Sequence, residues 1–282
     1  TVGVVGLGYV GLPLAVEKAK AGFRTIGFDV QEEKVKQVNA GHNYIGDVVD
    51  AELAQLVRNG TLSATSDFSF IKDVDFVAIC VPTPLDVHQE PDISYVESSA
   101  KSIAGHLTAG TIVVLESTTY PGTTEELIKP ILESGSGLKC GKDFYLGFSP
   151  ERVDPGNAVY KTKNTPKVVG AVGKDAQDVI AAMYGADAIY IGGQQFSLRS
   201  RASNFSLKDI QEGVAFASQY GTKIHVTVNM LPHEDDFEGL REYVEALADA
   251  GVHAVIVASP SIAVFVKKHV PQLEVHISTQ HS

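Results

Sequence analysis

The feature that most constrains this chain is a glycine pattern directly after its first apolar segment. Residues 2–5 are apolar apart from one glycine, and Gly6, Gly8 and Gly11 then complete the spacing Gly-x-Gly-x-x-Gly. The apolar run predicts a buried strand, and the glycines predict a tight turn into a helix. In such a turn Gly6 allows the reversal, Gly8 lets a ligand approach the backbone, and Gly11 lets the helix pack closely on the strand. The pattern is typical of a dinucleotide-binding βαβ unit.

The residues that follow extend this interpretation. An amphipathic stretch with Pro13 in its first turn predicts a helix, Gly22 ends it, and the apolar residues 25–28 lead into Asp29. The N-terminus of the helix would offer unpaired N–H groups to a pyrophosphate. Asp29 can accept hydrogen bonds from both ribose hydroxyls and would repel a 2′-phosphate, so NAD is favoured over NADP. A glycine triplet alone is often only a turn, and it is this longer context that favours a dinucleotide.

Length and composition favour a globular protein of two domains. The chain has 282 residues, of which 44% are hydrophobic and 20% charged, with a net charge of −11. No apolar run approaches the ~20 residues that span a bilayer, so we expect no membrane as a partner. The chain also lacks the excess of basic residues that favours nucleic-acid binding, so we expect no nucleic acid as a partner. Cys80 and Cys140 have no metal or redox spacing, which suits a cytoplasmic protein without a metal site. Thr1 stands almost inside the first strand, so we expect a trimmed start.

Apolar, β-branched segments alternate with helical patterns through the first part of the chain. The strongest of these segments are residues 75–81, 111–115 and 144–148. Their continuous apolar character predicts a Rossmann-type doubly wound parallel sheet, covered on both faces, over residues 1–172. Polar residues 82–84, 116–122 and 149–152 follow these strands, where ligands of such sheets bind. We expect a nicotinamide there, although Thr and Pro after strands can also serve only as caps and turns.

Four ordered motifs carry a resemblance to a known family. They are Gly-Leu-Gly-Tyr-Val-Gly-Leu-Pro at 6–13, Cys-Val-Pro-Thr-Pro at 80–84, Glu-Ser-Thr-Thr-Tyr-Pro-Gly-Thr-Thr at 116–124 and Phe-Ser-Pro-Glu-Arg-Val-Asp-Pro-Gly-Asn at 148–157. With them, residues 1–172 resemble the NAD-binding domain of the UDP-glucose/UDP-mannuronate dehydrogenase family, most of all its UDP-N-acetylglucosamine 6-dehydrogenase branch. The resemblance implies an oxidoreductase that uses NAD and acts on a UDP-sugar.

The resemblance also implies roles for individual residues. Thr83 and Thr118 would lie near the nicotinamide, and Thr118 and Glu151 would orient the catalytic water. The other expected cofactor contacts are Gly6, Gly8, Tyr9, Val10, Gly11 and Asp29.

The chemistry of the family requires a further residue type. The family oxidises an alcohol twice, through a thiohemiacetal and a thioester, with a cysteine nucleophile and a lysine and asparagine from a central helical domain. None of these motifs occurs in the sequence, and neither does the UDP-sugar domain. Cys80 lies within an apolar strand and Cys140 within a turn, so neither is expected to be the nucleophile. We therefore expect NAD binding without full turnover, and any UDP-sugar would lack its main binding domain.

The remaining residues follow a different pattern. Strands are predicted at 188–191, 223–228, 254–257 and 274–277, with helices at 206–220, 237–250 and 261–270 between them. Strand and helix alternate without a glycine fingerprint, which predicts a partial (β/α) barrel domain over residues 173–282. The complete prediction is therefore an α/β protein, a Rossmann-type sheet followed by a (β/α) half-barrel fragment.

A second resemblance covers residues 184–282. Its motifs are Gly-Ala-Asp-Ala-Ile-Tyr-Ile-Gly-Gly-Gln-Gln-Phe-Ser-Leu-Arg at 185–199, Val-Thr-Val-Asn at 226–229, Ala-Val-Ile-Val at 254–257 and His-Ile-Ser-Thr-Gln at 276–280. These resemble part of the TIM-type barrel of the collagenase-like peptidase family. That family is linked to proteolysis, RNA hydroxylation and ubiquinone synthesis, but its cysteine-bearing signature is absent here.

The candidate chemistry of this second part has simple alternatives. Arg199 and Arg201 could hold a phosphate or carboxylate, or could lie in a solvated loop. His225 and His276 fit core histidines better than metal ligands, and residues 233–236 fit the acidic start of a helix. The polar residues at strand ends could bind a ligand or satisfy local backbone groups; they are Gln194, Gln195, Asn229, Ser278, Thr279 and Gln280.

The two resemblances meet near residues 173–185. The whole chain looks like a chimera, whether natural, engineered or artefactual, joined within a helix that both parents would supply. Four barrel strands leave two open edges, so we expect self-association, as a homo-oligomer, or marginal stability. Three hypotheses stay open: an NAD-binding dehydrogenase-like protein, a hydrolase-like or RNA-modification-related barrel fragment, and a non-catalytic engineered fold.

Overall fold

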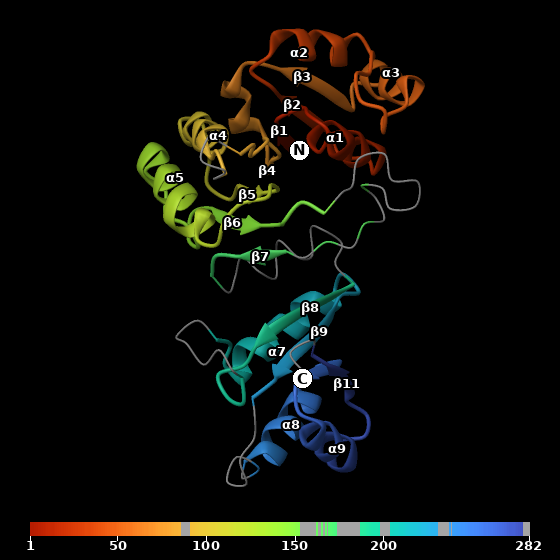
Figure 1. Ribbon diagram of the computed structural model, residues 1–282, viewed down its shortest axis with the longest axis vertical. Helices are drawn as coiled ribbons and strands as arrows, with labels where there is room; N and C mark the ends of the chain where they lie inside the picture. The colour runs from red at the N-terminus through yellow and green to blue at the C-terminus, as the bar shows by residue number, and fades with distance from the viewer. Residues whose placement is uncertain are drawn as a thin grey trace. The chain divides into compact units, whose positions relative to one another are not determined.

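The computed structural model describes residues 1–85, 91–152, 162, 165, 167, 169–173, 187–197, 204–230, 237 and 239–278 (Figure 1). The chain divides into two compact units, Thr1–Val172, called unit 1 below, and Gly173–Ser282, called unit 2. The helix expected near residues 173–185, where the two resemblances meet, lies outside the described residues beyond Gly173. In the part of the chain that is described, no helix combines the length and the apolar character needed to cross a membrane.

Unit 1 is built on a seven-stranded sheet with the strand order β3-β2-β1-β4-β5-β6-β7. The strands are β1 Val2–Val5, β2 Thr25–Phe28, β3 Leu62–Thr65, β4 Phe76–Ile79, β5 Ile112–Leu115, β6 Tyr145–Phe148 and β7 Gly170–Ala171. All pairs are parallel except β6 with β7. The order reverses direction at β1, between β2 and β4, which confirms the predicted Rossmann-type topology and places a ligand crevice at that point.

Helices cover both faces of this sheet, as the apolar strands require. They are α1 Gly11–Lys20, α2 Glu32–Asn39, α3 Asp50–Arg58, α4 Ser94–Ala104 and α5 Lys129–Ser136, with the 3₁₀ helix η1 Phe68–Asp73 and the π-helical turn η2 Thr123–Ile128. In Figure 1, α4 and α5 lie to the left of the sheet and α1 and α3 to its right. Every residue of β1, β2, β4 and β5 is buried as a result.

The first residues of neighbouring strands in unit 1 lie opposite one another in the register of the sheet. Val2 of β1 stands opposite Thr25 of β2 and Phe76 of β4, and Phe76 stands opposite Ile112 of β5. Since these strands also have equal lengths, their carboxyl ends reach the same edge of the sheet. The glycine turn, Asp29 and the polar segments after β4 and β5 are therefore brought to one edge.

Unit 2 contains a second parallel sheet, with the strand order β11-β10-β9-β8. Its strands are β8 Ala188–Gly192, β9 Lys223–Val228, β10 Ala254–Val257 and β11 Glu274–Ile277, and its described helices are α7 Leu207–Ser218, α8 Leu240–Asp249 and α9 Pro260–His269. Each strand pairs with the next in sequence, without the reversal seen in unit 1. This sequential βα order is the one expected of a (β/α) half-barrel.

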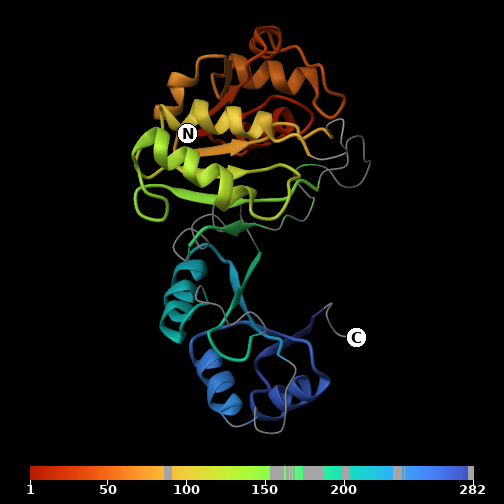
Figure 2. The same ribbon diagram turned by 60° about the vertical axis from the view of Figure 1, so that its left-hand side comes forward.

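The two faces of the unit 2 sheet differ. Ile189, Ile191, Ile224 and Val226 are buried on the face that packs against the helices, whereas Tyr190, between two of them, is exposed. Figure 2 gives a second view of these strands and of α7, α8 and α9. The alternation along β8 and β9 is the period of two that a sheet buried on one face requires.

Candidate active site

A cavity of about 740 Å³ lies at the carboxyl edge of the unit 1 sheet. Its lining includes residues that follow β1, β2, β4, β5 and β6. All the predicted cofactor contacts except Gly11 are among them, and so are both predicted catalytic residues; the set is Gly6, Gly8, Tyr9, Val10, Asp29, Thr83, Thr118 and Glu151. The edge of the sheet therefore brings together residues that are far apart in the sequence.

The glycine turn has the geometry that its three positions predict. Gly6 has φ +91°, a left-handed conformation that side chains disfavour. A Cβ on Gly11 would lie 1.8 Å from the Gly6 carbonyl oxygen, so no other residue fits there without moving the turn. A Cβ on Gly8 would meet nothing within 4 Å. Gly11 thus lets α1 pack on the turn, and Gly8 faces open space where a ligand can reach the backbone.

Asp29 is held at the end of β2 by backbone hydrogen bonds. Its side chain is 7% exposed, and its Oδ2 accepts from the Leu7 N–H at 2.9 Å while Oδ1 accepts from the Gln31 N–H at 2.9 Å. Lys34 Nζ lies 3.5 Å from Oδ2. Each carboxylate oxygen has two lone pairs, so both can still accept hydrogen bonds from a ligand.

Tyr44 also lines this end of the cavity, and no pattern in the sequence indicated it. Its hydroxyl donates to the Leu7 carbonyl at 2.7 Å, in the glycine turn. Burial raises the pKa of Tyr44, and the nearby Asp29 carboxylate raises it further, so the phenol stays protonated and keeps donating. A tyrosine 37 residues away from its partner has no local sequence signal.

The other end of the cavity is formed by the segments after β4, β5 and β6. The Thr83 hydroxyl donates to the Thr118 carbonyl at 2.6 Å, and the Ser117 hydroxyl donates to the Val81 carbonyl at 3.0 Å. These two bonds hold the segments after β4 and β5 against each other. Glu151 follows β6, and its Oε1 accepts from the Arg152 N–H at 2.8 Å. Thr83, Thr118 and Glu151 all line the cavity.

A charged pair that the sequence did not indicate lies at the same end. Glu116, directly after β5, is 1% exposed and forms an ion pair and hydrogen bond with Lys167. Both residues belong to unit 1, and they are 51 positions apart in the sequence. Only the fold brings them together.

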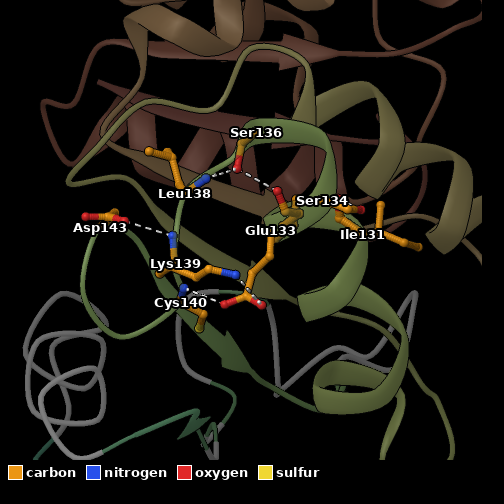
Figure 3. A network of polar contacts seen from close by, with 9 residues as sticks. Ile131, Glu133, Ser134, Ser136, Leu138, Lys139, Cys140 and Asp143 are labelled. Carbon is orange, nitrogen blue, oxygen red and sulfur yellow. Dashed lines mark hydrogen bonds and ion pairs between the residues drawn. The ribbon is translucent and has the colours of Figure 1, made fainter.

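Neither cysteine is placed as an activated thiolate. Burial raises the pKa of the Cys80 thiol well above its ordinary value, and the Glu116 carboxylate raises it further. Cys140 lies in the turn shown in Figure 3, where its N–H donates to Glu133 Oε1 at 3.0 Å and the Lys139 N–H donates to Asp143 Oδ2 at 2.9 Å. Burial raises the pKa of this thiol as well. A raised pKa lowers the thiolate population that a nucleophile requires.

The candidate residues of unit 2 are only partly described. Residues 233–236, Arg199, Arg201, Thr279 and Gln280 lie outside the described residues. Among those described, the His225 ring contacts the rings of His276 and His253 at centroid distances of 4.8 Å and 5.9 Å. Within the described ranges, no group of three or more His, Cys, Asp or Glu side chains is arranged to hold a metal ion. The Gln194 N–H donates to the Phe205 carbonyl at 3.0 Å, in keeping with a local role for this strand end.

Comparisons with known proteins match the two parts of the chain to different families. Residues 1–187 match the sequence model of the UDP-glucose/GDP-mannose dehydrogenase family, NAD binding domain, and residues 175–282 match that of Peptidase family U32. The UDP-N-acetyl-D-glucosamine 6-dehydrogenase of Pseudomonas aeruginosa is 38% identical over 184 residues, covering 65% of this chain and 42% of that protein. The tRNA hydroxylation protein P1 of Bacillus subtilis (strain 168) is 46% identical over 117 residues, covering 42% of this chain and 28% of that protein.

A solved structure shows the same fold. The NDP-N-acetyl-D-galactosaminuronic acid dehydrogenase of Methanosarcina mazei Go1 superposes with a TM-score of 0.57 at 27% identity, covering 86% of this chain and 46% of that one. This chain therefore spans less than half the length of these two dehydrogenases. The glycine turn, Asp29 and the cavity fit a dinucleotide, and the matching domain binds NAD. The chain belongs to the UDP-glucose/GDP-mannose dehydrogenase family, through the NAD binding domain that makes up about its first two thirds.

Proposed function

We propose that this chain binds NAD in the unit 1 cavity as a UDP-N-acetylhexosamine 6-dehydrogenase-like protein, and that it does not complete the double oxidation. The observation that carries the proposal is the cavity itself, which joins the glycine turn and Asp29 at one end to Thr83, Thr118 and Glu151 at the other. When bound, NAD supplies the hydride acceptor for oxidation of an alcohol. A single crevice at the switch point of a doubly wound sheet is where such a cofactor binds.

Different residues of the cavity would bind different parts of the cofactor. Asp29 would accept hydrogen bonds from the adenosine ribose, with the backbone N–H groups of Leu7 and Gln31 keeping its carboxylate in place. The turn at Gly8, together with Tyr9 and Val10, would hold the pyrophosphate against the N-terminus of α1. That helix carries no acidic residue in its first turn, which suits an anion.

The segments after β4, β5 and β6 would hold the nicotinamide half. The bond from Thr83 to the Thr118 carbonyl fixes both threonines beside Glu151 along the same cavity. By likeness to the family, Thr118 and Glu151 would orient the catalytic water.

The burial and the raised pKa of the two cysteine thiols support the proposed lack of full turnover. The sequence holds two cysteines, and both belong to unit 1. Cys80 is 5% exposed with a raised thiol pKa, and the pKa of the half-buried Cys140 is raised too. A thioester intermediate needs an accessible, activated thiolate, which supports binding without completion of the reaction in this polypeptide. The free thiols and the absence of a disulfide between them also support a cytoplasmic location.

Calorimetric titration of the whole chain tests the proposal. We expect saturable NAD binding and much weaker NADP binding, with no UDP-N-acetylglucosaminuronate formed from UDP-N-acetylglucosamine. Gly8→Leu should abolish NAD binding because its side chain would fill the space that the ligand needs. Gly105→Leu is the matched control, since a Cβ there also meets nothing within 4 Å but the residue does not line the cavity. No NAD binding by the wild type would refute the binding claim, and formation of the uronate would refute the claim about turnover.

A second candidate function belongs to unit 2. We infer that residues 173–282 form a domain separate from residues 1–172, a fragment of a (β/α) barrel related to peptidases or RNA-modification proteins, so that the chain is a chimera of two families. The match of residues 175–282 to Peptidase family U32 and the sequential order of β8 to β11 support this. Binding of tRNA to the full chain, unaffected by Gly8→Leu, would favour this function over the first.

The sheet of unit 2 also supports a proposal about assembly. β8 and β11 each pair with one strand within the described residues, so each leaves an edge. Unpaired edges of parallel strands favour pairing with another copy. We therefore expect a homo-oligomer, and light scattering that shows a stable monomer at all concentrations would contradict this expectation.

A further inference from the structure

A charge cluster around a buried carboxylate lies at the β5 end of the unit 1 cavity. It consists of Glu116, Lys167 and Lys18, and we call it the Glu116 cluster. Glu116 follows β5 and is 1% exposed, and the side chain of Lys167 is 16% exposed and forms an ion pair with it. The charge of Lys18, from α1, interacts with the charges of both Glu116 and Lys167. The three residues come from three separate parts of unit 1.

The cluster reaches the half of the cavity that would hold the nicotinamide. Glu116 lines the cavity together with Ser117, Thr118 and Glu151. Asp29, which is proposed to hold the adenosine ribose, follows β2. This strand lies on the opposite side of β1 from β4 and β5. A dinucleotide that extends from β2 across β1 must therefore place its nicotinamide over the ends of β4 and β5.

The two lysines of the cluster have pKa shifts in opposite directions. Burial disfavours the charge on Lys167, but the attraction and hydrogen bond of Glu116 outweigh it and raise the Lys167 pKa. Burial lowers the pKa of Lys18, with Glu116 opposing the shift and Lys167 adding to it. The negative charge of Glu116 is therefore compensated mainly by Lys167 and to a smaller extent by Lys18. A buried charge of this kind acts on its surroundings with little screening by solvent.

The two forms of the cofactor differ by one charge at the nicotinamide ring. The oxidised ring is a cation, and the reduced ring is neutral. We propose that the Glu116 cluster sets how strongly the cavity favours oxidised over reduced cofactor, with Glu116 stabilising the cationic ring and Lys167 limiting that preference. The inference rests on the proposed NAD site and adds a discriminating role for residues outside the glycine turn.

The test compares three ligands on the full chain. Dissociation constants are measured for NAD, NADH and ADP-ribose, which contains the adenosine, pyrophosphate and second ribose but no nicotinamide. Glu116→Gln keeps the shape and removes the charge, so the preference for NAD over NADH should fall by about tenfold, as expected for one charge at this depth. Lys167→Met should shift the preference in the opposite direction, and Lys167→Arg should restore the wild-type value.

The controls separate this role from a structural one. ADP-ribose affinity should stay unchanged in all three variants, because that ligand lacks the group whose charge changes. Glu133→Gln is the matched variant outside the cavity, as Glu133 also pairs with a lysine, Lys139 (Figure 3). It should leave all three constants unchanged.

Three results would overturn the inference. One is an unchanged ratio of NAD to NADH affinity in Glu116→Gln, and another is an equal loss for all three ligands. The third is a shift in the same direction for Glu116→Gln and Lys167→Met. Failure of the wild type to bind NAD and ADP-ribose at all would instead refute the proposed function on which the inference rests. If Lys167→Met does not fold, the nearly isosteric Glu116→Gln still decides the question.

Discussion

The contact at Gly11 allows a quantitative prediction that separates folding from binding. In Gly11→Ala, the new methyl group would lie 1.8 Å from the Gly6 carbonyl oxygen, 3.0 Å from its carbon and 3.1 Å from Cys80 Cβ. The nearest atoms are backbone, which cannot rotate away, so the turn or α1 must move by more than about 1 Å to reach ordinary contact distance. Overpacking of this kind costs about 1–3 kcal/mol. The same movement would displace the turn that is proposed to hold the pyrophosphate.

Urea unfolding measures this cost, with Gly8→Ala as the matched control. A loss of 1–3 kcal/mol corresponds to a midpoint shift of roughly 1 M urea for a domain of this size. Because unit 1 and unit 2 can unfold separately, the transition that belongs to unit 1 is identified as the one that NAD moves to higher urea. Gly8→Ala should keep the wild-type midpoint, because its Cβ meets no atom within 4 Å, yet should bind NAD more weakly.

The packing role of Gly11 would be refuted by a Gly11→Ala variant as stable as the wild type to within about 0.5 kcal/mol. A Gly8→Ala variant that is destabilised as strongly as Gly11→Ala would refute it as well. In either case the glycines would not have the separate packing and access roles that the geometry assigns to them.

Three further predictions concern single positions. Asp29→Ser removes the charge that repels a 2′-phosphate, so the ratio of NADP to NAD affinity, measured by calorimetry, should rise at least about tenfold; an unchanged ratio would mean that Asp29 does not face the ribose. Ser206→Ala removes the cap of α7, where Ser206 Oγ accepts from the Asp209 N–H at 3.2 Å, and should cost about 1 kcal/mol in the urea transition of unit 2, with no effect on NAD binding. The pKa of His225 lies below its ordinary value of 6.5 through burial and the neighbouring His276 and His253, so unit 2 should lose stability as the pH falls from about 7 to about 5; His225→Gln should flatten this slope, and an equal slope in that variant would contradict the assignment.

The parts of the site that could be predicted from the sequence depend on local geometry. The turn at Gly6, Gly8 and Gly11 is set by its own backbone, and Asp29 follows directly from the strand before it. The segments after β4 and β5 were predicted to lie at one ligand-binding edge because the carboxyl ends of parallel strands bind ligands, and the family resemblance placed Thr83 and Thr118 there; the structure joins these two residues by a hydrogen bond of 2.6 Å.

The parts that could not be predicted depend on contacts between distant segments. Tyr44 forms a hydrogen bond with Leu7, and Lys167 forms an ion pair with Glu116. In neither case does the residue type or the spacing in the sequence predict the contact. The last strand of unit 1 also differs from its prediction. It is Gly170–Ala171 and runs antiparallel to β6, whereas the apolar pattern predicted a parallel sheet, because pairing and not hydropathy sets the direction of an edge strand.

Titration of the intact chain with NAD shows whether the unit 1 cavity is a cofactor site. The structure predicts a saturable site that binds NAD, that discriminates against NADP, and that is lost in Gly8→Leu but kept in Gly105→Leu. An absence of NAD binding by the folded wild-type chain, or equal binding by Gly8→Leu, would contradict the claim that the unit 1 cavity is a cofactor site.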